Sequence, residues 1–353
     1  MARLDTQGHE SVRSPVARGL RAFPLASTPK GMRLTNESTF TRRRFLSALI
    51  QGAFLIGASS RHGAAAPLRS DISKKRGPPR RIVDVEGPPE KALAVLLEEL
   101  GGIRQFVAPG AKVLIKPNMS FPNPPGMATT TDPRVLKAII LACLDAGASR
   151  IMVADHPMRP WELCAEKTGI RSACAGIKEV VLLGADQEQW YRRVALDRGV
   201  ELKETKVLRA LFESDVLINV PRMKSHSATT VSLGIKGAMG LIWERSSFHV
   251  RMDLNEAIAD LATCVQADLT VLDGTSVLTD GGPLGPGTVT ELRCLIGGVD
   301  PVAVDAYGVH KVAWYGRPFA ASDIPHIEAC HRRGLGEIDL DRMDIHRTKV
   351  QGL

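Results

Sequence analysis

The amino-acid sequence predicts an α/β fold: a mainly parallel, doubly wound sheet with helices on both faces, Rossmann-like in arrangement. Short apolar runs of strand length alternate with segments of helical periodicity over residues 81–353. Some of these runs, such as residues 216–220, are rich in β-branched residues, as buried strands are. The hydrophobic share of 44% is ample for a large core, and we find no internal repeat.

Each element follows from a local pattern. Strands are expected at residues 81–86, 112–115, 150–154, 179–183, 216–220, 269–272 and 292–296. Helices are expected at residues 89–100, 133–146, 161–174 and 253–265, from residue 301 onward and at 322–332. Asp132 and Asp300 each precede a proline at a helix start, which is the pattern of an N-cap followed by a first helical turn. Residues 186–206 are polar and fit neither pattern, and residues 279–287 form a Gly/Pro-rich loop.

The N-terminal part has the pattern of an export signal. Arg42 and Arg43, followed by Phe45 and Leu46, resemble the twin-arginine signal. The apolar stretch that follows, residues 45–58, is too short and too polar for a membrane-spanning helix. Small residues around positions 63–66 suit signal cleavage. We therefore expect a partnership with the twin-arginine translocase, a periplasmic or secreted location, and no stable membrane span after cleavage.

These features set the expected domain boundaries. Residues 1–66 are expected to be a disordered signal segment, with Met32 as an alternative start, and residues 67–80 a basic linker. Residues 81–353 then form one α/β domain. Residues 1–66 contain ten Lys/Arg and three Asp/Glu, so the remainder is close to neutral, although the whole chain carries +8. With only 5% aromatic residues, nucleic-acid binding is not expected.

Residues 215–249 carry the strongest functional signal. The strand at 216–220 stops at Pro221, and the following residues are expected to form a cationic loop with Arg222, Lys224 and His226. Lys236 lies in an otherwise uncharged run with three glycines, where desolvation lowers the pKa of an amine and makes it a better nucleophile. The alternative is that the stem of Lys236 is buried and its amine simply extends to solvent. We favour a functional role.

Polar residues end several expected strands. They are Lys116 and Asn118, Asp155 and His156, Lys224 and His226, and Asp273. If these strands are parallel, all four ends lie at one edge of the sheet, where such folds bind small-molecule ligands.

Seven short motifs of the chain together resemble the domain of unknown function 362 (DUF362) family. They are residues 113–118, 130–133, 215–226, 235–240, 273–274, 281–285 and 300–305, in the family's order. Many family members carry ferredoxin-type cysteine clusters. The six cysteines here form no such motif, so no iron–sulfur cofactor is expected, and we expect few or no disulfides.

The sequence also resembles, more distantly, the N-terminal domain of lactate racemase, a family with a nickel-pincer nucleotide. This resemblance implies that His156 and His226 are catalytic, that Lys236 anchors the cofactor, and that His249 is a metal ligand. The family's substrate-binding arginine is replaced by Asp132. Two neutral imidazoles can remove and return a proton, and imidazole is a common nickel or zinc ligand.

Three hypotheses follow. The first is an enzyme, racemase- or epimerase-like or redox, that acts on a small hydroxy or carboxylic acid with a nickel-pincer nucleotide or another metal cofactor. In that enzyme, the residues expected to bind the cofactor are Lys116, Asn118, Lys224, Lys236 and Asp273. The second is a non-catalytic protein that binds an anionic or phosphorylated ligand through Lys116, Lys224, Lys236 and the loop at residues 281–287. The third is a domain that has kept the fold and lost the chemistry.

Overall fold

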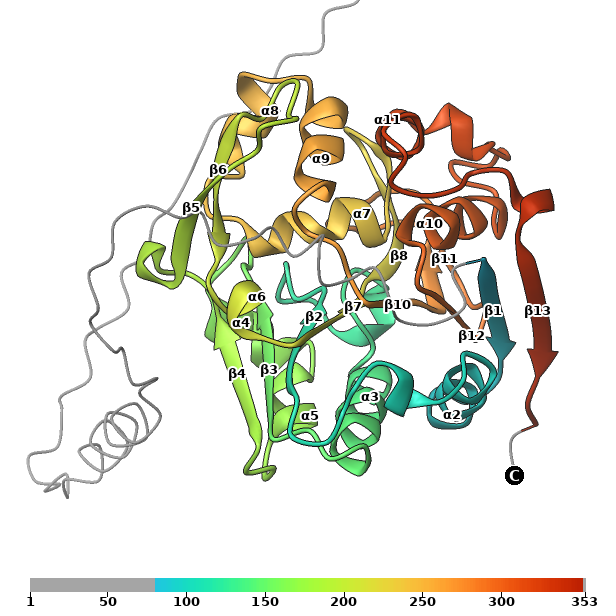
Figure 1. Ribbon diagram of the computed structural model, residues 1–353. Coiled ribbons are helices and arrows are strands. Elements are labelled where there is room, and N and C mark those ends of the chain that lie inside the picture. Colours follow the sequence, from blue (N-terminus) through green and yellow to red (C-terminus); the bar gives the residue numbers. More distant parts are fainter. Residues whose placement is uncertain (1–79, 352–353) are drawn as a thin grey trace, which may run out of the picture. The chain divides into compact units, whose positions relative to one another are not determined.

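The computed structural model describes residues 80–351, without the side chains of residues 247 and 249 (Figure 1). The expected signal segment, and the expected linker up to residue 79, lie outside the described residues. Among the described residues, no helix combines the length and the apolar character that crossing a membrane requires.

A large mixed sheet organises the domain, in the order β13-β1-β12-β10-β7-β2-β3-β4. Its strands are β1 (Arg81–Glu86), β2 (Lys112–Pro117), β3 (Arg150–Asp155), β4 (Val180–Gly184), β7 (Val216–Val220), β8 (Arg222–His226), β9 (Thr230–Ser232), β10 (Leu269–Leu278), β11 (Val289–Thr290), β12 (Cys294–Gly298) and β13 (Asp344–Lys349). The run β10-β7-β2-β3-β4 is parallel, whereas β12 pairs antiparallel with both β1 and β10. The mainly parallel α/β fold predicted from the sequence is thus confirmed.

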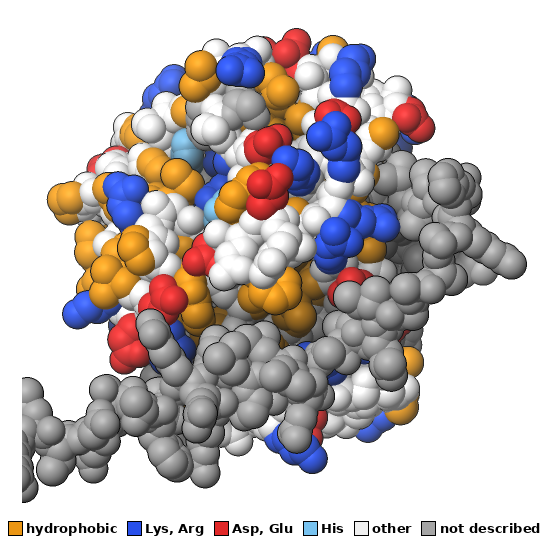
Figure 2. Space-filling view, turned by 90° about the vertical axis from the view of Figure 1, so that its left-hand side faces the viewer, with side chains coloured by type: hydrophobic (Ala, Val, Ile, Leu, Met, Phe, Trp, Pro, Cys, Tyr) orange, Lys and Arg blue, Asp and Glu red, His pale blue; other side chains and the backbone are white. Residues whose placement is uncertain are grey.

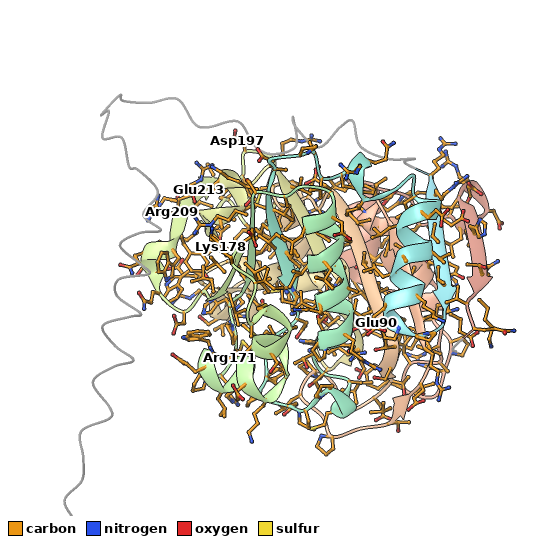
Figure 3. All side chains as sticks on the ribbon, turned by 90° about the horizontal axis from the view of Figure 1, so that it is seen from below. Glu90, Arg171, Lys178, Asp197, Arg209 and Glu213 are labelled. Atoms are coloured by element: carbon orange, nitrogen blue, oxygen red, sulfur yellow. The ribbon has the colours of Figure 1, made fainter. Side chains whose placement is uncertain are left out.

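Helices cover both faces of this sheet. The α-helices are α2 (Pro89–Glu99), α3 (Pro133–Asp145), α4 (Trp161–Lys167), α5 (Ile170–Cys174), α6 (Ala210–Glu213), α7 (Gly234–Gly237), α8 (Ser246–Val250), α9 (Leu254–Ala262), α10 (Pro301–His310) and α11 (Pro325–Arg332). Short 3-10 helices are η3 (Ile103–Gln105), η4 (Pro125–Met127), η5 (Glu188–Trp190), η6 (Ala238–Leu241), η7 (Ala321–Asp323) and η8 (Leu340–Arg342). Figure 3 shows α2 and α3 side by side over one face.

Two apolar cores follow from the alternation of side chains along the strands. Ile115 of β2 faces the core that α2, α3 and α5 close. Leu114 faces the opposite core, which α9, α10 and α11 close. Lys116, two residues beyond Leu114, lies on the same side of the strand as Leu114, and this side carries the candidate site.

The caps expected from the sequence are present. The Asp132 side chain accepts a hydrogen bond from Arg134 N at the start of α3. The Asp300 side chain does the same for Val302 N and Ala303 N at the start of α10. Each carboxylate satisfies backbone N–H groups that lack a partner within the helix.

Two expectations about local structure were wrong, and one segment for which no element was expected contains a strand. Residues 222–226 form strand β8 rather than a loop, because the chain continues after Pro221 alongside β10. Residues 161–174 form two helices, separated at Gly169 by a φ of 76° that glycine adopts without strain. Residues 186–206 contain β5 (Tyr191–Ala195), which pairs with β6 (Glu204–Leu208) as a separate antiparallel ribbon.

Candidate functional site

Parallel pairing of β2 and β3 brings the ends of these two strands together. Nζ of Lys116 lies 3.3 Å from Oδ1 of Asp155, and both side chains are buried. Asp155 also accepts hydrogen bonds from Met119 N at 2.7 Å and from His156 N at 3.1 Å. Burial lowers the pKa of Lys116, although the Asp155 carboxylate acts in the opposite direction.

Gly240 lies against this ion pair. A Cβ atom at position 240 would be 1.9 Å from Oδ1 of Asp155 and 2.9 Å from Nζ of Lys116. The Gly240 carbonyl oxygen accepts a hydrogen bond from His156 N at 2.9 Å. A glycine is required here because the backbone of η6 approaches the strand ends too closely for a side chain.

Lys224 of β8 brings a second buried amine to this part of the fold. Its Nζ donates to Thr129 O at 2.6 Å and lies 3.4 Å from Asn118 Oδ1. It also lies 5.1 Å from the centre of the Phe121 ring. Burial, and then the charges of Lys236 and Lys116, hold the pKa of Lys224 well below its usual range.

Lys236 differs from Lys116 and Lys224 in its burial and in its partners. It is half-buried on α7, and no hydrogen bond or ion pair joins its amine to any other described residue. Burial, followed by the charges of Arg245 and Lys116, lowers the pKa of Lys236 to about 8. At neutral pH this amine is mostly protonated and free to bind an anion, and a substantial fraction is available as a nucleophile at slightly higher pH.

His156 follows Asp155 and is half-buried. Its Nδ1 lies 3.0 Å from Ile242 O, and a carbonyl oxygen can only accept, so Nδ1 carries the proton in the neutral ring. The ring stacks on Trp243, with centroids 5.1 Å apart. Burial, and then the charge of Arg245, lower the pKa of His156. The imidazole is therefore neutral at pH 7, with the Nε2 lone pair as its acceptor.

We call Lys116, Lys224, Lys236 and Arg245 the basic cluster. The charges of Lys116 and Lys236 each act on Lys224, and the charge of Arg245 acts on both Lys116 and Lys236. Asp155 is the acidic group that acts on Lys116, Lys224 and Arg245. Figure 2 shows Lys/Arg and His side chains set back in a hollow between hydrophobic side chains. Four basic side chains around one carboxylate suit an anionic ligand.

Asp273, predicted to bind a cofactor, lies within β10 rather than at its end. Its Oδ1 lies 3.0 Å from Arg222 Nη1, and its Oδ2 accepts from Asp132 N at 2.7 Å. Thr275 also donates to Oδ1. Both carboxylate oxygens are therefore used to join β8, β10 and the start of α3.

The remaining predicted residues are placed as follows. Asn118 follows β2, and its Oδ1 faces Lys224 as described above. His226 ends β8 two residues after Lys224, on the same side of the strand, and its Nδ1 accepts from Ala228 N at 3.2 Å. His249 lies on α8, and its side chain is outside the described structure, so its role as a metal ligand stays a prediction. Within residues 80–351, no group of three or more His, Cys, Asp or Glu is placed to hold a metal ion.

Sequence reasoning missed His326. This residue of α11 is fully buried, and neither ring nitrogen has a hydrogen-bond partner among the described residues. Burial, and then the charge of Lys236, lower the pKa of His326 to about 3. The local pattern of residues 322–332 does not indicate that His326 lies close enough to Lys236 for the lysine charge to lower its pKa. Only the tertiary structure shows this.

The sequence matches the family described as Domain of unknown function (DUF362) over residues 113–310, more than half of the chain. The protein belongs to the DUF362 family. The match spans Lys116, Asp155, Lys224, Lys236 and Arg245, so the whole basic cluster lies in the part of the chain that defines this membership.

This DUF362 member is similar to one curated protein and to two solved structures. The thylakoid-associated protein sll1697 of Synechocystis sp. is 28% identical over 221 residues, 61% of this chain and 67% of that protein. A solved Thermotoga maritima protein is 18% identical, with a TM-score of 0.34 over 58% of this chain and 55% of that one. The lactate racemase apoprotein of Thermoanaerobacterium thermosaccharolyticum is 10% identical, with a TM-score of 0.41 over 78% of this chain. The chain spans 60% of that racemase structure.

Proposed function

We propose that this DUF362 protein is an enzyme that binds the anionic group of a small hydroxy or carboxylic acid at the basic cluster. The observation that carries this proposal is the half-buried amine of Lys236, which lies in the field of Lys116 and Arg245 and has no hydrogen-bond or ion-pair partner within residues 80–351. Lys116 and Lys224 are held in place by protein partners, so the positive charge is organised before a ligand arrives. Lys236 is the member of the cluster that is free to bind the ligand directly.

His156 is the group we propose for proton transfer. Its ring is neutral at pH 7, Ile242 O fixes which nitrogen carries the proton, and stacking on Trp243 fixes its plane. A substrate hydroxyl within reach of Nε2 can transfer its proton there: the O–H bond breaks and an N–H bond forms. His226 would serve as a second proton-transfer group in a racemase- or epimerase-like reaction, and this assignment rests on the sequence resemblance.

A nickel-pincer nucleotide, the cofactor that the resemblance implies, fits part of this site. The amine of Lys236, which has no partner among the described residues, suits a covalent attachment in place of direct anion binding, and Lys116 and Arg245 suit a phosphate group. When bound, such a cofactor would supply the redox step at the substrate carbon. Elemental analysis and intact mass spectrometry of protein produced in a cytoplasm should then detect stoichiometric nickel and an adduct on Lys236.

The binding part of the proposal has a direct test. Isothermal titration calorimetry at pH 7 with L-lactate and with inorganic phosphate measures Kd for the wild type and for Lys236→Met. The substitution keeps an unbranched side chain and removes the charge. We expect Kd for both anions to rise at least tenfold, which corresponds to about 1.4 kcal/mol. Lys178→Met is the matched control, because Lys178 is exposed in the connection before β4 (Figure 3). Equal affinity in wild type and Lys236→Met would contradict the proposal.

A second candidate function is a non-catalytic binding protein for an anionic or phosphorylated ligand. It is favoured by the preorganised Lys224, whose amine is fixed by Thr129 O and Asn118 Oδ1. Protein that is colourless, metal-free and unmodified at Lys236, yet binds phosphate, would support this candidate over the enzyme. Racemisation of L-lactate or of a related hydroxy acid, lost in His156→Gln, would support the enzyme.

We further propose that residues 1–66 direct export by the twin-arginine translocase. The support is the order of Arg42 and Arg43, the apolar stretch and the small residues at 63–66. Fractionation of cells producing the full chain should place a shortened protein outside the cytoplasm. Replacement of both arginines by lysine should retain the full-length protein in the cytoplasm, and export unaffected by that change would exclude the translocase.

A further inference from the structure

A cavity of about 200 Å³ lies on the side of the sheet that α7, α9, α10 and α11 cover. Its inner end includes Lys116, Leu217 and Asn219, which are all buried. Its outer end includes residues 266–267 and 299–301, which are partly exposed in the segments before β10 and before α10. Apart from Lys116, no member of the basic cluster lines it, and neither does the proposed proton-transfer group. The cavity is therefore a space of its own, beside the candidate site.

Most of the cavity wall is apolar. Ile235, Leu241, Val265 and Val302 contribute to it, among others. A cavity of about 150 Å³ with such a lining stays dry and binds benzene. The present cavity therefore has room for an apolar molecule of about six to eight non-hydrogen atoms.

The polar groups of the inner end already have partners or are out of reach. Nζ of Lys116 lies 3.3 Å from Asp155 Oδ1, and Asp155 is on β3, on the far side of β2 from β7. Nδ2 of Asn219 donates to Gly234 O at 3.1 Å. Oδ1 of Asn219 has no partner among the described residues, but this atom is itself buried, so a molecule in the cavity does not reach it. The inner end thus offers a ligand no polar contact.

The outer end offers one polar contact. Oδ1 of Asp300 accepts hydrogen bonds from Val302 N and Ala303 N, and its Oδ2 accepts from Glu337 N at 2.9 Å. Gln266 is the remaining polar side chain of the wall, and it is partly exposed. Because an ordered water needs several polar partners, the inner part of the cavity is suited to an apolar molecule rather than to water.

The charges of the wall decide which class of molecule fits. A charged group loses its hydration when it enters an apolar cavity, and only a partner of opposite charge compensates for this loss. The carboxylate of Asp300 already binds three backbone N–H groups, and the amine of Lys116 already faces Asp155. Neither an anion nor a cation therefore finds a free counter-charge, whereas an uncharged molecule needs none.

We infer that the cavity is a second ligand site, which binds an uncharged apolar molecule of the size of one aromatic ring. A hydroxyl on such a molecule would point outward, toward Gln266 and solvent. Ile235 of α7 and Leu241 of η6 belong to the segment that carries Lys236, so the bound molecule packs against that segment. The site is separate from the basic cluster and does not depend on the function proposed there.

Three probes of similar size and different charge test the inference by isothermal titration calorimetry on the full chain at pH 7. They are benzyl alcohol, benzylamine, which is a cation at this pH, and benzoate, which is an anion. In the wild type we expect benzyl alcohol to bind at least tenfold more tightly than benzylamine. Benzoate has a carboxylate for the basic cluster, so its signal is compared between the wild type and the filled variant described next.

Filling the cavity gives that variant. Ala262 lines the cavity from α9 and is partly exposed. Ala262→Phe should weaken the binding of benzyl alcohol at least tenfold and leave the affinity for benzoate unchanged. Ala142→Phe is the matched control, because Ala142 is equally half-buried but lies on α3, on the opposite face of the sheet. Its affinity for benzyl alcohol should equal that of the wild type.

A measurement on the wild type keeps the test decisive if Ala262→Phe does not fold. Crystals soaked with iodobenzene should show anomalous scattering from iodine between α7 and α9. Iodine bound elsewhere or not at all, or no binding of benzyl alcohol to the wild type, would overturn the inference. So would equal binding of benzyl alcohol by the wild type and a folded Ala262→Phe. Benzylamine that binds as tightly as benzyl alcohol would overturn the assignment to uncharged molecules. Phosphate binding at Lys236 is measured separately and decides only the proposed function.

Discussion

Nζ of Lys116 lies 3.3 Å from Oδ1 of Asp155, and the backbone of Gly240 lies directly against both side chains. The pair is buried, so its attraction must offset a large desolvation cost. Two backbone N–H groups, of Met119 and His156, donate to the same carboxylate and help to do so. This ion pair fixes the position of one lysine of the basic cluster.

Gly240→Ala should disrupt the site. The new Cβ would lie 1.9 Å from Asp155 Oδ1, so the ion pair or η6 must move. We expect a loss of about 1–3 kcal/mol in the free energy of unfolding, from urea denaturation, together with weaker phosphate binding. Gly237→Ala is the control, because its Cβ would meet only Pro221 Cβ at 3.6 Å and its φ of −57° suits alanine. If both variants behave alike, the close approach at Gly240 is unimportant.

Lys236 should react with amine-directed reagents at lower pH than surface lysines do. Its pKa of about 8 means that half of the amine is neutral at that pH, whereas an ordinary lysine is almost fully protonated. Acetylation followed by mass spectrometry from pH 6.5 to 10 should give a midpoint near 8 at Lys236. Anion affinity should change in the opposite sense and fall as pH rises through 8. A midpoint above pH 10 would contradict the desolvated environment.

His326 should make stability depend on pH in the acidic range. Its pKa is about 3 in the folded chain against an ordinary 6.5, so the unfolded chain binds more protons between these values. The contribution of the neutral His326 to the free energy of unfolding is therefore fully present above pH 6.5. It is lost as pH falls toward 3, by on the order of 5 kcal/mol.

The test compares wild type with His326→Phe by urea denaturation at pH 7 and pH 4.5. The loss between the two pH values should be smaller in the variant, because phenylalanine takes up no proton. Asp305, whose pKa is raised to about 7 by burial, is present in both proteins and cancels in the comparison. Parallel losses in the two proteins would show that His326 remains accessible to protons in the folded state.

Asp273→Asn should be strongly destabilising. It leaves the buried Arg222 without its charge partner, which costs about 3–5 kcal/mol of unfolding free energy when one member of a buried pair is removed. The control is Asp344→Asn, which breaks the exposed pair with Arg81 and should cost less than about 1 kcal/mol. Both values come from urea denaturation at pH 7. Near-equal costs would mean that Asp273 is not chiefly structural.

Local patterns were enough for much of the fold. The strand at 216–220 has the predicted bounds, and the Asp132 and Asp300 caps are where the proline-containing helix starts indicated. These features depend on residues within a few positions of one another, so a single sequence contains them. The uncharged, glycine-rich surroundings of Lys236 likewise pointed to a desolvated amine, and its pKa is lowered as expected. The family motifs fixed the DUF362 membership for the same reason.

Only the tertiary structure decided which polar residues meet. Arg222 was expected in a ligand-binding loop, but it lies in β8 and binds Asp273. His326, whose ring nitrogens have no hydrogen-bond partner among the described residues, lies in a segment with no local signal of function. Strand register and helix packing determine these meetings through contacts between residues far apart in the chain, and no periodicity within one segment encodes them. The sequence by itself therefore determined the fold class and pointed to the amine of Lys236. The tertiary structure determined which groups surround that amine.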